Sequence, residues 1–355
     1  MIKKKKRKLI YPIILSLVLL LTGCSAAKEE DTQAQEEQQY LTVGFSQLGA
    51  ESDWRVANTE SIKDSLSRTN GIELLFDDAQ QKQDRQILAI RNFIQQEVDC
   101  IVLAPVTETG WDTVLEEARD ADIPVIIVDR MVNVKDTYLY TAWVGSDFKR
   151  EASIACEWLN SFALAKGISA RDIKIVDLQG TLGATAQIGR SSGLVLGSKK
   201  YGWNIVASVP ADYTQAKGKE VMQSLLKDHD DINVVYCEND NEAIGAIEAI
   251  EESGRKVGTD IRNGEILIIS FDAAHSGLSK VLEGKIALDV ECNPLQGEPL
   301  RQLINEVKGG QEFQKYTYIE EKAFSADDTI KKVKIDDTSY DITILTPEIL
   351  EQREY

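Results

Sequence analysis

Short apolar runs alternate along the chain with segments in which apolar residues recur at helical spacing. Four early runs, each ending at a polar or turn residue, read as buried strands: 41–46, 72–77, 99–103 and 125–128. Between them, apolar residues share one helical face in two segments, one at Ile87, Ile90 and Ile94, and one at Trp111, Val114, Leu115 and Ala118. This alternation predicts a parallel sheet covered by helices on both sides, with right-handed crossovers.

The same alternation starts again after an apolar run at 141–144. Further strands are predicted at 173–178, 204–208, 234–237 and 266–271. Two further amphipathic helices are indicated by Ile154, Ala155, Trp158 and Phe162, and by Ile244, Ile247 and Ile250. The pattern therefore predicts an α/β fold with two doubly wound parallel-sheet units in tandem, although no sequence repeat links them.

The N-terminus has the pattern of a secretory signal. A basic run, Lys3–Lys8, precedes 14 nearly uncharged positions, Leu9–Thr22. Because a bilayer-spanning helix needs about 20 apolar residues, this stretch is too short to be one and indicates a signal peptide at 1–23. An uncleaved anchor that ends by chance at a cysteine is the alternative.

The residues at the predicted cleavage point, Leu21-Thr22-Gly23-Cys24, resemble a bacterial lipobox. This resemblance implies that Cys24 is lipidated and that the protein is attached to the outer face of the cytoplasmic membrane. Residues 24–39 are mostly small or charged, without a large apolar residue before Tyr40, which predicts a disordered linker.

The charge of the chain argues against a nucleic-acid partner. The formal net charge is −18, and removal of the six basic residues Lys3–Lys8 takes it to −24. A surface this acidic repels phosphate backbones.

Four cysteines of the mature chain lie in or beside apolar segments far apart in the sequence, at Cys100, Cys156, Cys237 and Cys292. This placement favours buried free thiols over disulfides. No C-x-x-C motif occurs, and only His229 and His275 could supply imidazole. We therefore expect no metal site.

Polar residues with several hydrogen-bonding atoms follow the predicted strands. In parallel sheets ligands bind beyond the carboxyl ends of the strands, so these positions are candidate ligand contacts. They are Ser46, Gln47, Asp78, Gln80, Gln81, Pro105, Asp129, Arg130, Asp147, Gln179–Thr181, Asn239, Asp240, Asp272 and Glu291–Asn293. Many single positions of this kind are helix caps instead. Asp129-Arg130 is harder to explain as a cap, because an adjacent acid and base are costly to bury without partners.

Aromatic side chains at Trp54, Trp111, Trp143 and Tyr213 could cover the apolar face of a sugar ring, although Trp111 and Trp158 lie on apolar helical faces typical of core residues. The mixture of planar polar and aromatic groups suits a small, neutral, hydroxyl-rich ligand.

No catalytic or cofactor motif is found. G-x-G-x-x-G, G-x-x-x-x-G-K and G-x-S-x-G are all absent. We therefore expect neither an enzyme nor a cofactor, while a glycosidase built from two carboxylates that converge in space stays open.

Several motifs, in order along the chain, resemble the ribose-binding-like periplasmic sugar-binding proteins, and among them the galactofuranose-binding members. They are Leu41–Gln47, Glu51-Ser52, Trp54-Arg55, Gln80–Gln83, Ala104–Val106, Thr109–Trp111, Val128–Arg130, Leu178–Thr181, Gly218–Met222, Asn239-Asp240 and Ile244–Ile247. The resemblance covers essentially all of residues 41–355.

The resemblance implies two lobes joined by a three-strand hinge, which close on one monosaccharide without metal or nucleotide. Residues 40–145 with about 294–320 would form the first lobe, and residues 146–293 with the tail to 355 the second. The implied sugar contacts are Ser46, Gln47, Trp54, Arg55, Asp129, Arg130, Asp147, Arg190, Tyr213, Asn239, Asp272 and Asn293.

The same resemblance implies a monomeric solute-binding lipoprotein that delivers sugar to an ABC permease and its ATPase subunits. The alternative is a sugar-sensing lipoprotein that presents its ligand to a membrane sensor kinase or chemoreceptor.

Overall fold

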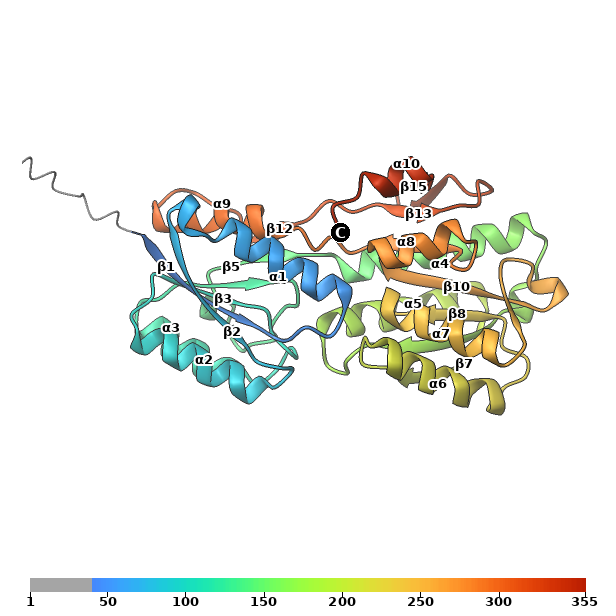
Figure 1. The fold of residues 1–355 in the computed structure, drawn as a ribbon, viewed down its shortest axis with the longest axis horizontal. Helices are drawn as coiled ribbons and strands as arrows, with labels where there is room; N and C mark the ends of the chain where they lie inside the picture. Colours follow the sequence, from blue (N-terminus) through green and yellow to red (C-terminus); the bar gives the residue numbers. More distant parts are fainter. Residues whose placement is uncertain (1–39) are drawn as a thin grey trace, which may run out of the picture. The chain divides into compact units, whose positions relative to one another are not determined.

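The computed structural model describes residues 40–355 (Figure 1). The predicted signal peptide, the predicted lipidation site Cys24 and the predicted linker to residue 39 lie outside this part. The segment from Gln39 to Tyr355 forms one compact unit. Within it, two lobes are each built on a mostly parallel sheet with helices on both faces, which confirms the fold class. No helix in residues 40–355 is long and apolar enough to cross a membrane.

The first lobe contains a six-stranded, fully parallel sheet in the order β12-β5-β4-β3-β1-β2. Its strands are β1 (Leu41–Gln47), β2 (Ile72–Asp78), β3 (Cys100–Leu103), β4 (Val125–Val128), β5 (Ala142–Gly145) and β12 (Tyr316–Tyr318). Its helices are α1 (Asp53–Ser65), α2 (Gln83–Gln95), α3 (Asp112–Asp120) and α9 (Gly297–Lys308). Helix α9 and strand β12 thus return to this lobe from a late part of the chain.

The second lobe contains the larger sheet, in the order β14-β15-β13-β11-β10-β8-β6-β7, with β9 paired to β10. Its strands are β6 (Lys174–Gln179), β7 (Asn204–Pro210), β8 (Val234–Cys237), β9 (Lys256–Val257), β10 (Glu265–Asp272), β11 (Leu288–Glu291), β13 (Ala323–Ser325), β14 (Lys332–Ile335) and β15 (Thr338–Ile344). Its helices are α4 (Phe148–Ala165), α5 (Thr185–Tyr201), α6 (Gln215–Asp228), α7 (Asp240–Glu252), α8 (His275–Leu282) and α10 (Pro347–Glu351). Strand β13 runs antiparallel to β11, so the tail extends the sheet with a different strand direction.

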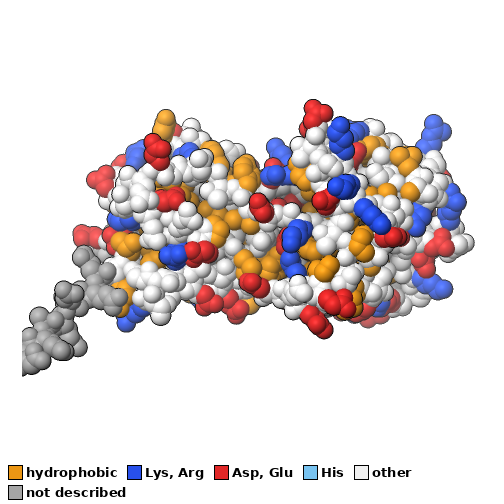
Figure 2. All heavy atoms as spheres, turned by 90° about the horizontal axis from the view of Figure 1, so that it is seen from above, with side chains coloured by type: hydrophobic (Ala, Val, Ile, Leu, Met, Phe, Trp, Pro, Cys, Tyr) orange, Lys and Arg blue, Asp and Glu red, His pale blue; other side chains and the backbone are white. Residues whose placement is uncertain are grey.

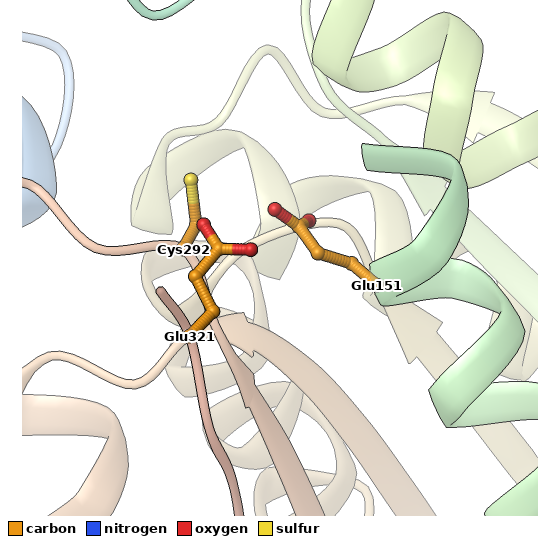
Figure 3. Close-up of side chains that lie close together, drawn as sticks. All are labelled: Glu151, Cys292 and Glu321. Atoms are coloured by element: carbon orange, nitrogen blue, oxygen red, sulfur yellow. The ribbon is translucent and has the colours of Figure 1, made fainter. Parts of the chain in front are cut away.

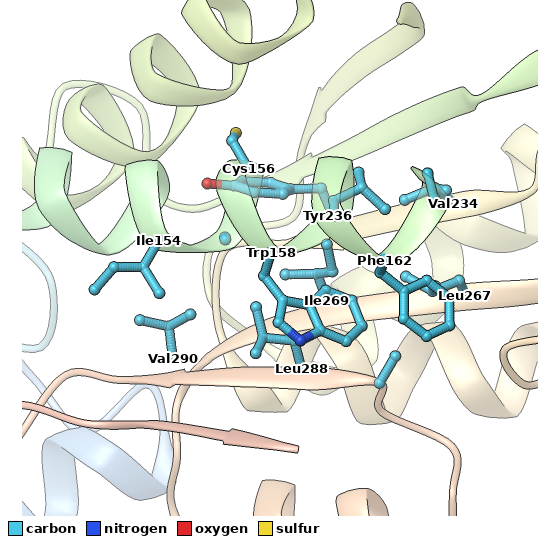
Figure 4. Packing of buried hydrophobic residues seen from close by; sticks show 14 of the residues in the cluster. Ile154, Cys156, Trp158, Phe162, Val234, Tyr236, Leu267, Ile269, Leu288 and Val290 are labelled. Atoms are coloured by element: carbon cyan, nitrogen blue, oxygen red, sulfur yellow. The ribbon is translucent and has the colours of Figure 1, made fainter. Parts of the chain in front are cut away.

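Each lobe has an apolar cluster on either face of its sheet. In the cluster between α4 and the second sheet, Trp158 stacks on Phe162 with ring centroids 4.9 Å apart (Figure 4). Trp111 is fully buried in a first-lobe cluster. Both tryptophans are therefore core residues, as their helical faces predicted. The cysteines are also as expected, since Cys100, Cys156, Cys237 and Cys292 are free and buried.

Three segments connect the two sheets: 146–147 between β5 and α4, 292–296 between β11 and α9, and 319–322 between β12 and β13. We call these three segments the hinge. All three are irregular, so the predicted three-strand hinge is a set of three crossings without strand structure. The positions of the crossings put the carboxyl ends of both sets of parallel strands on facing sides of the lobes.

The face of the molecule drawn in Figure 2 carries acidic and basic side chains interspersed over both lobes. On the surface of the second lobe, Lys219 forms ion pairs with Glu248 at 3.0 Å and with Glu252 at 2.6 Å. Exposed pairs of this kind contribute on the order of 0–1 kcal/mol of stability.

Candidate functional site

A small cavity lies between the two lobes, at the carboxyl ends of their strands. It encloses about 290 Å³ of space not filled by protein atoms. Its wall is formed by Glu51, Ser52, Trp54, Arg55, Asp129, Arg130, Phe148, Ala186, Arg190, Tyr213, Asn239, Asp272 and Cys292.

The lobes contact each other directly around this cavity. The backbone N–H of Asp53 donates to Asn241 Oδ1 (3.1 Å), and the Ser276 hydroxyl donates to Asp53 Oδ2 (2.9 Å). On another side, the N–H of Met131 donates to Thr185 Oγ1 (2.9 Å). The structure therefore corresponds to a closed arrangement of the two lobes.

The first lobe contributes a compact network of two acids and two arginines. Arg55 Nη2 lies 2.6 Å from Asp129 Oδ2, and Arg55 Nε lies 3.2 Å from Glu51 Oε1. The same Glu51 oxygen lies 3.3 Å from Arg130 Nη2, while Arg130 Nη1 donates to the Val106 carbonyl at 2.9 Å. All four side chains are nearly fully buried. Buried charges need partners of opposite sign, and here the two acids balance the two arginines.

Local structure fixes the members of this network. Ser52 caps α1 by accepting the N–H of Arg55, so that residues 54 and 55 stand on the first turn of the helix. Asp129 directly follows β4 and has φ of +61°, a left-handed conformation that Asp tolerates better than most residues. Burial alone would raise the pKa of Glu51, but Arg55 and Arg130 outweigh it and lower that pKa below its ordinary value.

In the second lobe, one arginine stands among several acids. Arg190 donates from Nε to Glu151 Oε2 (2.8 Å) and from Nη1 to the Glu238 carbonyl (2.5 Å). Its Nη2 lies 3.6 Å from Asp272 Oδ1. Burial raises the pKa of Asp272 well above its ordinary value, although Arg190 acts in the opposite direction. Proton uptake is therefore easier at this end of the cavity than at the first-lobe network.

Tyr213 and Asn239 complete the second-lobe wall. Asn239 caps α7 by accepting the Glu242 N–H (2.9 Å) and donates from its amide to the Tyr213 carbonyl (3.1 Å). The Tyr213 ring packs directly over Gly180, where an added Cβ would lie 1.9 Å from the ring. Across the cavity, the Arg130 guanidinium lies 5.3 Å from the centroid of this ring. The glycine after β6 thus allows the tyrosine to reach the first lobe.

Four buried polar atoms of wall residues have no hydrogen-bond partner within residues 40–355: Glu51 Oε2, Arg55 Nη1, Arg190 Nη2 and Tyr213 Oη. Two belong to each lobe, and they include an acceptor, two donors and a hydroxyl that can be either. Buried polar groups normally have partners, because an unpaired group costs about 1–3 kcal/mol. The arrangement can therefore satisfy the hydroxyls of a neutral polyol.

Of the twelve ligand contacts predicted from the sequence, the structure brings eight together at the cavity: Trp54, Arg55, Asp129, Arg130, Arg190, Tyr213, Asn239 and Asp272. Trp54 also donates from Nε1 to the Cys292 carbonyl, so its indole spans from α1 to the hinge.

The other four, Ser46, Gln47, Asp147 and Asn293, are used elsewhere. Gln47 donates to Asn58 and Thr59 on α1, and the Ser46 side chain is buried outside the cavity wall. Asp147 caps α4 and pairs with Arg150, and Asn293 accepts the Leu295 N–H. Local capping and packing account for Gln47, Asp147 and Asn293, whereas Ser46 Oγ has no hydrogen-bond partner within residues 40–355.

Sequence reasoning missed four wall residues as candidate sugar contacts: Glu51, Ser52, Phe148 and Ala186. Glu51 and Ser52 precede α1 and are far from any strand end that the pattern marked. Cys292 also lines the wall; it was among the strand-end candidates and was expected to be a buried thiol, but it was not among the twelve contacts implied by the resemblance. A signal for Glu51 existed in its i, i+4 spacing to Arg55, which places an acid beside the base of the Trp54-Arg55 pair.

Comparison with known proteins places the chain in a family. The model of the periplasmic binding protein domain matches residues 43–296. The chain belongs to this family. The galactofuranose-binding protein YtfQ of Escherichia coli is 40% identical over 286 residues, which are 79% of this chain and 85% of that protein. The ribose import binding protein of Bacillus subtilis is 28% identical over 87% of this chain and 96% of its own length.

Solved structures give the same result. A Mycobacterium smegmatis protein in complex with β-D-fucofuranose is 43% identical, with a TM-score of 0.75, and covers 80% of this chain and 91% of that one. An arabinose-transporter binding protein of Shewanella sp. ANA-3, bound to α- and β-L-arabinofuranose, is 40% identical with a TM-score of 0.75, covering 81% and 93%. These relatives are solute-binding proteins, and the chain is a sugar-binding protein of the same family.

Proposed function

We propose that this protein is the substrate-binding component of an ABC sugar importer and that it binds one aldose in its five-membered ring form. The observation that carries the proposal is the set of four unpartnered buried atoms in the wall of the cavity between the lobes. A charged ligand would upset the paired acids and arginines, whereas the hydroxyls of one neutral sugar satisfy both donors and acceptors.

Different residues of the wall would make different kinds of contact with the sugar. Asp129 and Arg130 offer an acceptor and a donor from the first lobe, and Arg190, Asn239 and Asp272 do so from the second. Trp54 and Phe148 supply apolar faces for the C–H side of the ring. A ligand that touches both lobes stabilises the closed arrangement through its contacts there.

The furanose preference is supported by relatives whose names or titles carry galactofuranose, fucofuranose and arabinofuranose at 38–43% identity. Calorimetry with free L-arabinose, free D-galactose, a methyl galactofuranoside and the matching locked methyl pyranosides tests it. A free sugar that is only partly furanose should bind with its affinity reduced by that fraction. Binding of the locked pyranosides but not of the furanoside would refute the ring preference. No binding of any aldose would refute sugar binding itself.

We also propose that Cys24 is lipidated and holds the protein at the outer face of the cytoplasmic membrane. Cys24→Ser should leave the protein unprocessed or release it into the soluble fraction, because stable membrane attachment depends on acyl chains. Sugar affinity should be unchanged, since every wall residue lies between 51 and 292. Membrane fractionation of parent and variant measures the first effect. A variant that is processed and stays with the membrane would contradict the assignment.

A further inference from the structure

Beneath the sugar cavity, three side chains capable of binding metal converge at the hinge. Glu151 stands on the first turns of α4, Cys292 begins the second crossing, and Glu321 lies in the third (Figure 3). One ligand atom of each lies within 4.8 Å of the other two. Figure 3 shows the Glu151 carboxylate pointing toward Cys292 and Glu321.

The oxygens of Glu151 are used unequally. Oε2 accepts from Arg190 at 2.8 Å, whereas Oε1 has no hydrogen-bond partner within the described residues. The residue is only 1% exposed, so this oxygen has no access to bulk water to replace the missing partner. Leaving a buried carboxylate oxygen unpaired is costly, which points to a partner that the protein atoms do not supply.

The remaining members are held in place by the hinge itself. The Asn293 N–H donates to Glu321 Oε1 at 3.3 Å, and Ser146 Oγ lies 3.3 Å from Cys292 Sγ. All three crossings therefore contribute to the cluster.

A second, larger pocket lies next to the cluster. It encloses about 880 Å³ and is lined by Glu151 and Glu321 together with Arg150, Ile154, Val290, Tyr318, Ile319, Glu320, Lys322 and Tyr340. Cys292, by contrast, lines the sugar cavity. The cluster thus lies between the two spaces, and an ion could reach it from the outer pocket without passing the sugar.

We propose that Glu151, Cys292 and Glu321 bind one zinc ion at the hinge. A thiolate with two carboxylates suits a borderline-soft divalent cation, and three protein ligands leave the fourth tetrahedral position for water. Zinc bonds of about 2.0–2.3 Å place tetrahedral ligands roughly 3.5 Å apart, so side-chain movements of about one ångström complete the site. Arg190, which pairs with the far oxygen of Glu151, would orient that ligand from outside the site.

The sequence analysis expected no metal site, because zinc motifs are recognised by closely spaced Cys and His. Here the three ligands come from positions separated by 141 and 29 residues, and two are carboxylates. A bound ion would tie α4 to the second and third crossings. The proposal is independent of which sugar the cavity binds.

Zinc calorimetry and Co²⁺ absorption on the full-length protein in detergent test the proposal. One equivalent of Zn²⁺ should bind with micromolar or better affinity, and Co²⁺ should give a sulfur-to-metal charge-transfer band that requires a thiolate ligand. Glu321→Gln should weaken zinc binding by at least the roughly tenfold loss seen for outer-shell changes. Cys292→Ser should remove the band.

Glu320→Gln is the matched control, because Glu320 lines the same outer pocket but is exposed and outside the cluster. It should bind zinc as the parent does. Absence of stoichiometric zinc binding would overturn the proposal, and so would zinc binding that survives both Glu321→Gln and Cys292→Ser, since the ion would then sit elsewhere. Far-ultraviolet circular dichroism checks that both variants are folded.

Discussion

The two lobes differ in how the charges around their halves of the cavity are balanced. In the first lobe, two acids and two arginines neutralise one another at 2.6–3.3 Å. In the second, Arg190 pairs with Glu151 and Asp272, and the lobe also buries further acids, among them Asp177, Glu238, Asp240, Glu242 and Asp289.

The pKa shifts follow this difference. In the first lobe, the pKa of Glu51 is lowered despite the burial of its side chain. In the second lobe, burial raises the pKa of both Asp177 and Asp289 to about 7. Asp289 is further influenced by a hydrogen bond with Asp240, whose own pKa is raised by burial and by Asp289. The first lobe should therefore supply a fixed, charged half of the site, and the second lobe should be the part that responds to pH.

Removing charge from the balanced network should have the largest effect. We expect Asp129→Asn to weaken sugar binding by about 2–4 kcal/mol, roughly thirty- to a thousandfold in Kd, because Arg55 loses its closest charged partner in a dry site. Asn suits the left-handed backbone at this position better than Ala, so the variant isolates the charge. Calorimetry measures the change, and binding within threefold of the parent would contradict the proposed role of Asp129.

The second-lobe acids should make stability fall as pH rises. A carboxyl whose folded pKa is raised stabilises the fold when protonated, and this contribution is lost between its ordinary pKa near 3.8 and its folded pKa of about 7. Asp177→Asn should therefore remove part of the loss, on the order of 2 kcal/mol between about pH 5 and about pH 8. Urea unfolding at both pH values measures it. Parallel pH dependences in parent and variant would exclude Asp177 as a source.

A smaller effect is expected where the second lobe positions Tyr213. In Gly180→Ala, the new methyl group would overlap the Tyr213 ring, so the ring must move out of the cavity wall. We expect sugar binding to weaken by about 1–2 kcal/mol through loss of packing and of the contact with Arg130. Gly284→Ala is not a suitable control, because Gly284 has φ of +73° and an alanine there would strain the backbone by itself. Unchanged affinity in Gly180→Ala would mean that the ring position does not matter for recognition.

The smallest effect should come from an ion pair outside both halves of the cavity. Glu117 accepts from Arg91 at 2.7 and 2.8 Å, but both side chains are more than a third exposed. Glu117→Gln should change the free energy of unfolding by less than about 1 kcal/mol and leave sugar affinity unchanged. It therefore serves as the matched control for Asp129→Asn in the same lobe. A binding loss in this variant would show that the assay responds to general destabilisation.

Much of the fold could be predicted because buried parallel strands are short and uniformly apolar. The run at 125–128 coincides with β4, and the run at 234–237 with β8. Two helices with a clear apolar stripe, α2 and α3, were also found: α2 contains all three predicted face residues, and α3 contains all but Trp111, which immediately precedes it.

Two of the helices that the pattern missed, α1 and α5, have faces that do not look hydrophobic. Helix α1 buries Arg55 and Asn58 toward the site, and α5 buries Arg190. Helix α5 also presents Gly189, Gly193 and Gly197 to α4, where any added Cβ would lie 2.3–2.6 Å from the neighbouring helix. Functional and close-packed surfaces therefore break the periodicity on which the prediction depends.

The candidate site was predictable where a strand end also faces the cleft, as at Asp129 and Asp272. Strand ends alone could not separate these from Asp147, whose side chain caps its own helix. They also could not reveal Glu51, which is placed by the helix cap at Ser52 and not by a strand. The direction in which a side chain points near a helix cap depends on tertiary contacts, and these contacts produce no periodic pattern in the sequence.

The return of α9 and β12 to the first lobe has a consequence for how the chain matures. The edge strand β12 pairs with β5 across more than 170 residues of sequence, so the first sheet cannot be completed until residue 318 is available. During synthesis or export, roughly the first hundred residues of the lobe would be present before strand β12 and the covering helix α9 are available to pack on them. Such long-range pairing slows folding. A chain that stays incompletely folded until its end emerges is well matched to passage through a membrane in extended form.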